Sequence, residues 1–240
     1  MSYSVVIPSR NIHNLKVCVR AIRECGETCQ IIVVWDGPLC DLVDDDNWVM
    51  GEKPFIFARN CNIGIRAAGN DDVVLLNDDA LLRTDRGFEK LAAECDGFGA
   101  MCPGFTCGSV GTPNLVWRDR KEPVEEKVML VFACVYIPRS TIDRVGLLDE
   151  RFGVNAGGDG ARGYGLEDDD YSLRIRQAGM KLGVYDGVLV DHLPQSTGLK
   201  STFRHDPEHP HDVRAHEELF TAKHGHWPEG HGFASGRMKR

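Results

Sequence analysis

The sequence lacks long apolar runs, an excess of basic charge and paired cysteines. No segment of the 240 residues approaches the roughly eighteen consecutive apolar residues that a membrane-spanning helix needs. The formal net charge is −8, which argues against broad electrostatic capture of nucleic acid, because such capture requires a basic face. The first residues, MSYSVVIPSR, show no basic start followed by an apolar run. We therefore expect a cytoplasmic protein without a secretory leader.

The nine cysteines are odd in number and include no C-x-x-C pair. This pattern disfavours a disulfide framework and predicts reduced thiols, several of them buried as small hydrophobic side chains. A zinc site built from Cys25 and Cys29 is the alternative that their spacing leaves open.

The chain is 42% hydrophobic, which supports one large α/β domain, or one domain followed by a tail. Short runs rich in β-branched residues predict strands at 3–9, 30–37, 54–58, 72–77 and 127–138, with one or two more within 181–194. Helical spacing and caps predict helices at 12–24, 62–69, 139–146, from 166 onward, and in an amphipathic piece at 215–225. This alternation predicts a mostly parallel sheet with helices on both faces.

Polar residues follow three of the predicted strands where each strand ends. Ligands bind outside the carboxyl ends of the strands in a parallel α/β sheet, so these groups are expected at one edge. They are Pro8, Ser9 and Arg10, then Asp36 and Gly37, then Asn77, Asp78 and Asp79.

The adjacent carboxylates Asp78 and Asp79 directly follow a buried apolar run. Two carboxylates in a cleft repel each other and lose solvation, and a hard divalent cation removes both problems. Mg²⁺ and Mn²⁺ take oxygen ligands, often one or two carboxylates together with substrate phosphates. The alternative is an Asp-rich turn that caps the next helix.

A second acidic cluster, Glu167 to Asp170, opens a predicted helix after the glycine-dense loop 153–165. Acids at a helix N-terminus are partly ordinary capping, but four in a row exceed what capping needs. A carboxylate held there could act as a general base towards a hydroxyl. His192 ends another apolar run, where an imidazole can join the acidic residues as a metal ligand.

The order of these motifs resembles the family 2 glycosyltransferases of the GT-A fold. The similarity lies in SVVIPSRN, IIVVWDG, the stretch from FARNCNIG to LLNDDA, VYIPRSTIDRVGLLDERFG, and GYGLEDDDYSLR through to VDH. It spans residues 3 to about 193 in order. It departs from the family pattern where Trp35 replaces the first acid of the second segment and Asn77 replaces the first acid of D-x-D.

The resemblance implies a Rossmann-like GT-A fold with a smaller acceptor-side region, and an inverting, metal-dependent transfer from a nucleotide-diphosphate sugar, with a UDP-sugar favoured. Asp168 would be the catalytic base with Glu167 beside it, while Asp79 and His192 would bind Mn²⁺ or Mg²⁺. The implied donor-binding residues are Pro8, Ser9, Arg10, Asp36, Arg59, Asn62, Asn77 and Asp78. The acceptor hydroxyl would belong to a glycan, a lipid-linked glycan, a protein or a modified nucleobase.

The resemblance also suggests a division of the chain. Residues 1–194 would form the glycosyltransferase domain, with 1–100 as the nucleotide-sugar half and 101–194 as the acceptor side, followed by a polar His-rich extension at 195–240. Loop 153–165 would be a lid or a surface insertion. A sugar-phosphate nucleotidyltransferase and a non-catalytic nucleotide-sugar-binding module are the competing functions, although the basic glycine-rich loop of the former is missing after the first strand.

Overall fold

The computed structural model describes residues 2–38, 47–53, 55–106, 124–153, 166–192 and 213–227. Its strands are β1 Tyr3–Ser9, β2 Gln30–Trp35, β3 Asn47–Met50, β4 Asp72–Leu76, β5 Ala80–Leu82, β6 Phe98–Phe105, β7 Val124–Lys127, β8 Cys134–Ile137 and β9 Lys181–His192. Its helices are α1 Ile12–Glu24, α2 Phe57–Ala67, α3 Gly87–Glu94, α4 Arg139–Val145, the short 3-10 helix η2 Glu150–Gly153, α5 Glu167–Gln177 and α7 Val213–His224.

One mixed sheet runs through the described part of the chain in the order β3-β2-β1-β4-β8-β6-β9-β5, with β7 paired to β9. The first four strands are parallel to one another. Beyond them β8 is antiparallel to β4 and to β6, β6 is parallel to β9, and β5 and β7 are antiparallel to β9. Strands β1, β2, β3, β4, β6 and β9 therefore point the same way, which confirms the mostly parallel sheet.

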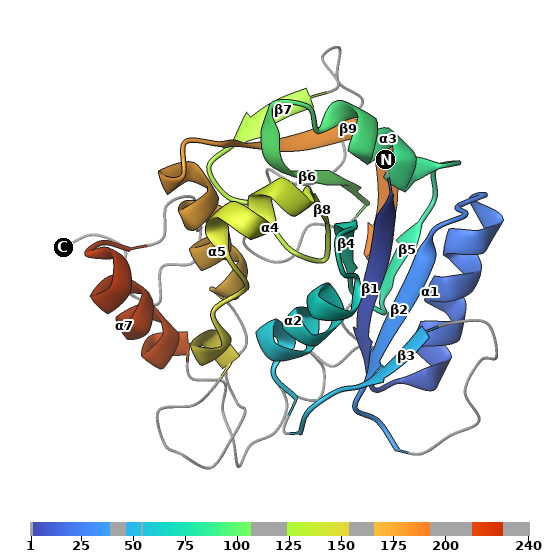
Figure 1. Ribbon diagram of the computed structural model, residues 1–240, viewed down its shortest axis with the longest axis horizontal. Coiled ribbons are helices and arrows are strands. Elements are labelled where there is room, and N and C mark those ends of the chain that lie inside the picture. Colours follow the sequence, from blue (N-terminus) through green and yellow to red (C-terminus); the bar gives the residue numbers. More distant parts are fainter. Residues whose placement is uncertain are drawn as a thin grey trace.

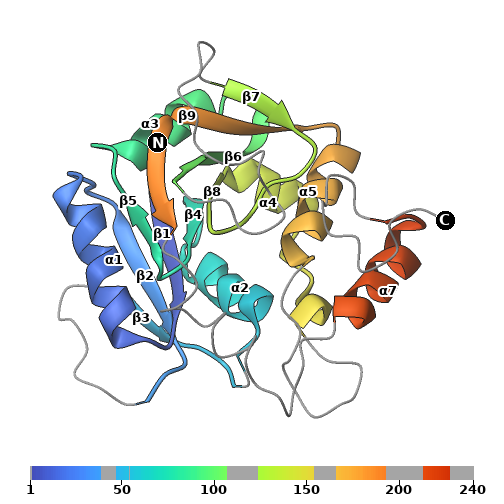
Figure 2. The same ribbon diagram turned by 180° about the vertical axis from the view of Figure 1, so that it is seen from behind.

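Helices α1 and α2 lie on opposite sides of the parallel strands, whereas α5 and α7 lie side by side at the far end from α1 (Figures 1 and 2). Helix α2 approaches the sheet so closely that a Cβ on Gly64 would lie 2.2 Å from Val6 Cγ1 and 3.0 Å from Val34 Cγ2. Only glycine allows this approach. It brings the start of α2 close to the carboxyl ends of the strands.

The main hydrophobic core consists of strand residues with near-zero exposure, sealed by the inner faces of the helices. A second, small cluster joins Phe152 of η2, Leu166 and Phe220 of α7. Within the described ranges, no helix combines the length and the apolar character needed to cross a membrane.

The predicted strand at 54–58 is wrong, because a helix begins inside it. Ile56 is the N-cap of α2, and the buried residues Phe57, Cys61 and Ile65 follow at helical spacing. A short apolar run cannot by itself distinguish a buried helix start from a buried strand. The third strand of the parallel set is instead β3, a partly exposed edge strand that lacks a continuous apolar signal.

The single strand expected at 127–138 is also wrong, since β7 ends at Lys127 and β8 begins at Cys134. The apolar residues between them pack against α5 without extending a strand. The Leu130 N–H donates to Ser172 Oγ at 3.1 Å, and the Phe132 ring meets Tyr171 edge to face. Burial there comes from helix packing, which an apolar run does not reveal. The other predicted strands, and the helices at 12–24 and 139–146 and from 166, are confirmed within a few residues.

Candidate functional site at the carboxyl ends of the strands

Ser9 and Asp78 meet at the carboxyl ends of β1 and β4, which are adjacent parallel strands. Ser9 Oγ donates a hydrogen bond of 2.6 Å to Asp78 Oδ2, and both residues are buried. Burial, with a smaller contribution from the carboxylates of Asp79 and Asp36, raises the pKa of Asp78 to about 7, although hydrogen bonds from Ser9 and Asn14 act in the opposite direction. The charged form of the Asp78 carboxyl group is therefore disfavoured in the ligand-free protein. A ligand that donates a hydrogen bond or carries positive charge would stabilise that form.

Asp79 and His192 are brought together by the antiparallel pairing of β5 with β9, in which Ala80 lies opposite His192. Asp79 Oδ1 and His192 Nε2 are 3.5 Å apart, and both side chains are nearly buried. The turn before β5 is fixed by the Ala80 N–H, which donates to the Asn77 carbonyl at 3.0 Å. Asn77 therefore contributes its backbone carbonyl to the turn between β4 and β5.

The geometry of this pair suits two ligands on one divalent cation. Neighbouring ligands of a six-coordinate Mg²⁺ lie about 3 Å apart, because each bond is roughly 2 Å long. The observed 3.5 Å between Asp79 Oδ1 and His192 Nε2 needs only a small adjustment. Over the described ranges, no group of three or more His, Cys, Asp or Glu side chains is arranged to hold a metal. A cation here would take its remaining ligands from water or from a phosphate-bearing substrate.

Asp36 ends β2 at the same edge and is only 2% exposed. Burial raises the pKa of its carboxyl group, although Arg10 and Lys53 act in the opposite direction. Its Oδ1 atom has no hydrogen-bond partner among the described residues. A buried acceptor without a donor is costly, and a ligand N–H or hydroxyl would satisfy it.

Asn60, on the first turn of α2, is a buried neighbour of this position that the sequence did not single out. Its Nδ2 has no partner among the described residues, while its Oδ1 accepts from the Glu52 N–H at 3.1 Å. A Cβ on Gly51 would lie 3.1 Å from both Asn60 Oδ1 and Asp36 Cβ. The spacing of Asn60 four residues before Gly64 was the available signal, since it puts both on the sheet-facing side of α2.

Two predicted donor-binding residues, Arg59 and Asn62, hold α2 to the segment around η2. Asn62 Nδ2 donates to the Leu148 carbonyl and to Glu150 Oε1, both at 2.9 Å, and its Oδ1 accepts from the Leu148 N–H. Arg59 lies 3.3 Å from Glu52 and 3.7 Å from Glu150. The contact of Arg59 and Asn62 with a donor stays a prediction. Arg10, which follows β1, is exposed.

The first turn of α5 carries Glu167, which is buried, and Asp168, which is partly buried. Burial raises the pKa of Asp168 well above its usual range, and the neighbouring carboxylates of Asp169 and Glu167 add to the rise. A carboxylate with a raised pKa is a stronger base than a solvated one. Glu167 also contributes to the raised pKa of Cys61 on α2, so this turn faces α2.

Asp170, from the same acidic run, has a different environment. It is fully buried and accepts from Arg174 Nε at 2.9 Å, Lys223 Nζ at 2.7 Å and His224 Nε2 at 2.7 Å. The four acids therefore differ in environment: Glu167 faces α2, whereas Asp170 is buried against Arg174 of α5 and Lys223 and His224 of α7.

Several predictions concern residues outside the described ranges: loop 154–165, which makes up nearly all of the expected lid; Cys40 and Cys107 among the nine cysteines; and the parts 195–212 and 228–240 of the His-rich extension. Of the two cysteines considered for zinc, Cys25 Sγ lies 3.5 Å from the Leu82 carbonyl oxygen, and burial raises the pKa of Cys29 to about 11. The tail residues in α7 pack through aromatic contacts, with His216 against Phe152 and His224 against Phe220.

No protein-family model matches the sequence, and no curated protein matches it by sequence. Among solved structures, the chain is similar to GalNAc-T7 with UDP, GalNAc and Mn²⁺, with a TM-score of 0.65 and 14% identity over 82% of this chain and 45% of that one. It is similar to the mannosyltransferase PcManGT from Pyrobaculum calidifontis in complex with GDP-Man and Mn²⁺, with a TM-score of 0.57 and 14% identity over 81% and 58% of the two chains. A UDP-glucose pyrophosphorylase from Acinetobacter baumanii gives a TM-score of 0.53 and 11% identity over 93% and 100%.

These similarities establish the fold, a mixed α/β GT-A architecture with a central, mostly parallel sheet flanked by helices. The chain spans about half the length of the two glycosyltransferases, 45% and 58% respectively. At 11–14% identity, activity and substrates do not follow from the fold.

Proposed function

We propose that this chain is an inverting, divalent-metal-dependent glycosyltransferase that uses a nucleotide-diphosphate sugar, with a UDP-sugar as the favoured donor. The observation that carries the proposal is the meeting of β1, β4, β5 and β9 at one edge, which gathers Ser9, Asp78, Asp79 and His192. Structural likeness to glycosyltransferases solved with UDP or GDP-Man and Mn²⁺ supports it.

The donor would bind along the carboxyl ends of β1, β2 and β4. Asp36 has the buried acceptor atom needed to take an N–H or hydroxyl of the nucleoside, and Pro8, Ser9, Arg10 and Asp78 line the neighbouring strand ends. Asp79 and His192 would hold Mn²⁺ or Mg²⁺, which when bound neutralises charge on the diphosphate leaving group.

Asp168 would remove the proton from the acceptor hydroxyl as that oxygen attacks the anomeric carbon. The bond from that carbon to the nucleotide oxygen breaks in the same displacement, which inverts the configuration. The raised pKa of Asp168 suits this step, because a carboxylate with a raised pKa is a stronger base than a solvated one. Glu167, buried beside it, contributes negative charge that keeps the pKa high.

The test is release of nucleoside diphosphate from nucleotide sugars by the purified protein, with Mn²⁺ and after chelation. Asp79→Ala and Asp168→Asn should each lower turnover by about 100-fold or more, since general bases alone contribute about 10²- to 10⁴-fold. The exposed Asp143→Asn is the matched control and should keep wild-type turnover. Undiminished turnover in both site variants would refute the assigned roles.

A sugar-phosphate nucleotidyltransferase is the second candidate, because the similarity to the pyrophosphorylase covers that chain completely. The two activities differ in product. A glycosyltransferase releases nucleoside diphosphate from a nucleotide sugar, whereas a nucleotidyltransferase releases pyrophosphate from a nucleoside triphosphate and a sugar phosphate. Pyrophosphate release that depends on Asp79 would favour the second function.

A further inference from the structure

Leu166, the residue before the acidic pair of α5, has an unusual backbone. Its φ and ψ of 70° and −1° lie in the left-handed region, where a residue with a Cβ is disfavoured by about 1–2 kcal/mol. Outside glycine, the described residues show this conformation only here and at Arg86. Such strain persists only when the surrounding packing determines it, and it tends to occur at functional sites.

The packing that surrounds Leu166 comes from the C-terminal helix. Leu166 is 6% exposed and forms a separate apolar cluster with Phe152 of η2 and Phe220 of α7, each 1% exposed. Because this cluster is distinct from the main core, the large sheet core does not hold Leu166. Phe220 is the member contributed by α7, which lies far from α5 in the sequence.

Charged contacts join the same two helices one turn further along α5. Lys223 Nζ lies 2.7 Å from Asp170 Oδ1 and 2.7 Å from Asp149 Oδ2, so it bridges α5 to the segment before η2. His224 Nε2 lies 2.7 Å from the same Asp170 oxygen. Arg174 completes the arrangement, with its Nε on Asp170 and its terminal nitrogens on the carbonyls of Val145 and Leu147, each at 2.9 Å.

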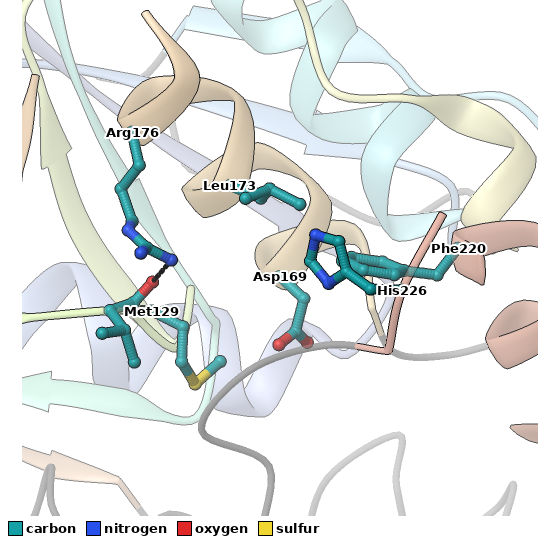
Figure 3. A pocket seen from close by; sticks show the side chains of 7 residues that line it. Met129, Asp169, Leu173, Arg176, Phe220 and His226 are labelled. Carbon is teal, nitrogen blue, oxygen red and sulfur yellow. Dashed lines mark hydrogen bonds between the residues drawn. The ribbon is translucent and has the colours of Figure 1, made fainter. Parts of the chain in front are cut away.

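Figure 3 shows the outer side of this contact. Phe220 and His226 lie beside the start of α5, next to Asp169 and Leu173, over a small cavity that Met129 and Arg176 also line. Phe220 and His226 therefore cover the first two turns of α5 with aromatic rings, while Lys223 and His224 contact the buried Asp170.

We infer that α7 is a positioning element of the transfer site: Phe220 and Lys223 fix the left-handed residue Leu166 and the buried Asp170, and so set the direction of Glu167 and Asp168 between them. The inference rests on the proposed function, because it gives α7 a role in the reaction through the proposed base. Phe220 and Lys223 touch no reacting atom in this scheme, and they act through the first turn of α5.

The simpler account is that α7 adds only general stability, and matched variants separate the two. Phe220→Leu removes the ring from the Leu166 cluster, and Phe88→Leu removes an equally buried ring from the main core, on α3. Lys223→Met keeps the apolar stem but removes the charge between Asp170 and Asp149. The control for Lys223→Met is Lys181→Met, which breaks an exposed ion pair between Lys181 and Glu126 of β7, 2.9 Å apart.

Steady-state kinetics with donor and acceptor give the first readout. Phe220→Leu and Lys223→Met should lower kcat by about 10- to 100-fold, as expected when a reacting group is displaced by about 1 Å, while the donor KM stays within about twofold. Lys223→Arg should recover most of the kcat. Phe88→Leu and Lys181→Met should leave kcat near the wild-type value. A kcat that is unchanged in both α7 variants, or that falls equally in Phe88→Leu, would overturn the inference.

Hydrogen exchange gives a second readout that needs no turnover. The Asp170 amide donates to the Leu166 carbonyl at 2.9 Å, so its protection reports on the first turn of α5. Phe220→Leu should speed exchange in a peptide covering 166–171 by about tenfold or more, with α1 unchanged, and Phe88→Leu should not. Unchanged exchange there would overturn the inference even in an active enzyme. Faster exchange in a protein that cleaves no nucleotide sugar would leave the coupling of α7 to α5 standing and would reject only the proposed function.

Discussion

Replacement of Asp78 by asparagine should stabilise the ligand-free protein at pH 8 and have little effect at pH 4. Asparagine keeps an oxygen that can accept the hydrogen bond from Ser9 Oγ, now 2.6 Å long, and it carries no charge to bury. The energetic effect therefore isolates the cost of placing a carboxylate at this strand end.

The magnitude follows from the pKa of Asp78, which is about 7 in the fold against an ordinary value of 3.8 for an aspartate. Below about pH 4 the carboxyl group is neutral in the folded and unfolded chains, so it costs the fold nothing. Between about pH 4 and 7 only the unfolded chain releases the proton, which lowers stability by about 1.4 kcal/mol for each pH unit. The loss is complete above pH 7, with a ceiling on the order of 4 kcal/mol, and relaxation of the site should reduce it to about 1–3 kcal/mol.

Thermal unfolding without metal or nucleotide measures this difference. A chain of this size shifts its Tm by about 2–4 °C per kcal/mol, so Asp78→Asn should melt roughly 3–10 °C above the wild type at pH 8 and close to it at pH 4. With Mn²⁺ and a UDP-sugar the order should reverse, because a ligand at 100 times its Kd adds about 2.7 kcal/mol to the form that binds it. A Tm difference that is independent of pH, or that favours the wild type at pH 8 without ligand, would refute the reasoning.

Three further substitutions test neighbouring parts of the structure. Ser9→Ala removes the hydrogen bond that lowers the pKa of Asp78, so the pH midpoint of Mn²⁺-dependent nucleotide binding should move upward in calorimetry; a downward shift would contradict the assignment. Asn62→Ala loses the bonds to Leu148 and Glu150 and should destabilise the protein by about 1–3 kcal/mol in denaturant. A tenfold loss of donor affinity with unchanged stability would instead place Asn62 in the donor site. Gly64→Ala puts a Cβ within 2.2 Å of Val6 and should cost about 1–3 kcal/mol in the same assay, whereas Gly69→Ala meets no atom within 4 Å and tests only the positive φ of 63°.

The parallel half of the fold could be predicted because its strands are buried on both faces. Strands β1, β2 and β4 are continuous apolar runs followed by polar residues. This pattern can be recognised in the sequence without knowing which strands lie beside them. The edge strand β3 has partly exposed residues and no such run, so it was missed. Burial alone misled at residues 54–58, where the apolar run belongs to the start of α2.

The division of labour within the acidic run of α5 could not be predicted from that run. Asp168 and Asp170 are the same residue type two positions apart, yet one has a strongly raised pKa and the other is buried against Arg174, Lys223 and His224. The Arg174 partner was visible at i,i+4 spacing, but Lys223 and His224 come from α7, which only tertiary structure places beside α5. The roles of acidic residues at the start of a helix can therefore be assigned only when their partners from distant parts of the sequence are known.

The pairing of Asp79 with His192 shows what a pattern of alternation can and cannot establish. In β9, Val188, Val190 and His192 are buried in turn, while Leu189 and Asp191 between them are less so, and this period of two is visible in the sequence GVLVDH. Alternation therefore predicts that His192 faces inward. It does not name the opposite strand, since β5 is only three residues long and carries no period of its own. The register that puts Ala80 opposite His192 is held on the other face by Arg83 and Asp191, 2.5 Å apart. A slip of one residue would turn Asp191 inward and carry the imidazole away from Asp79, so the candidate metal pair depends on a short antiparallel ladder as much as on its two ligands.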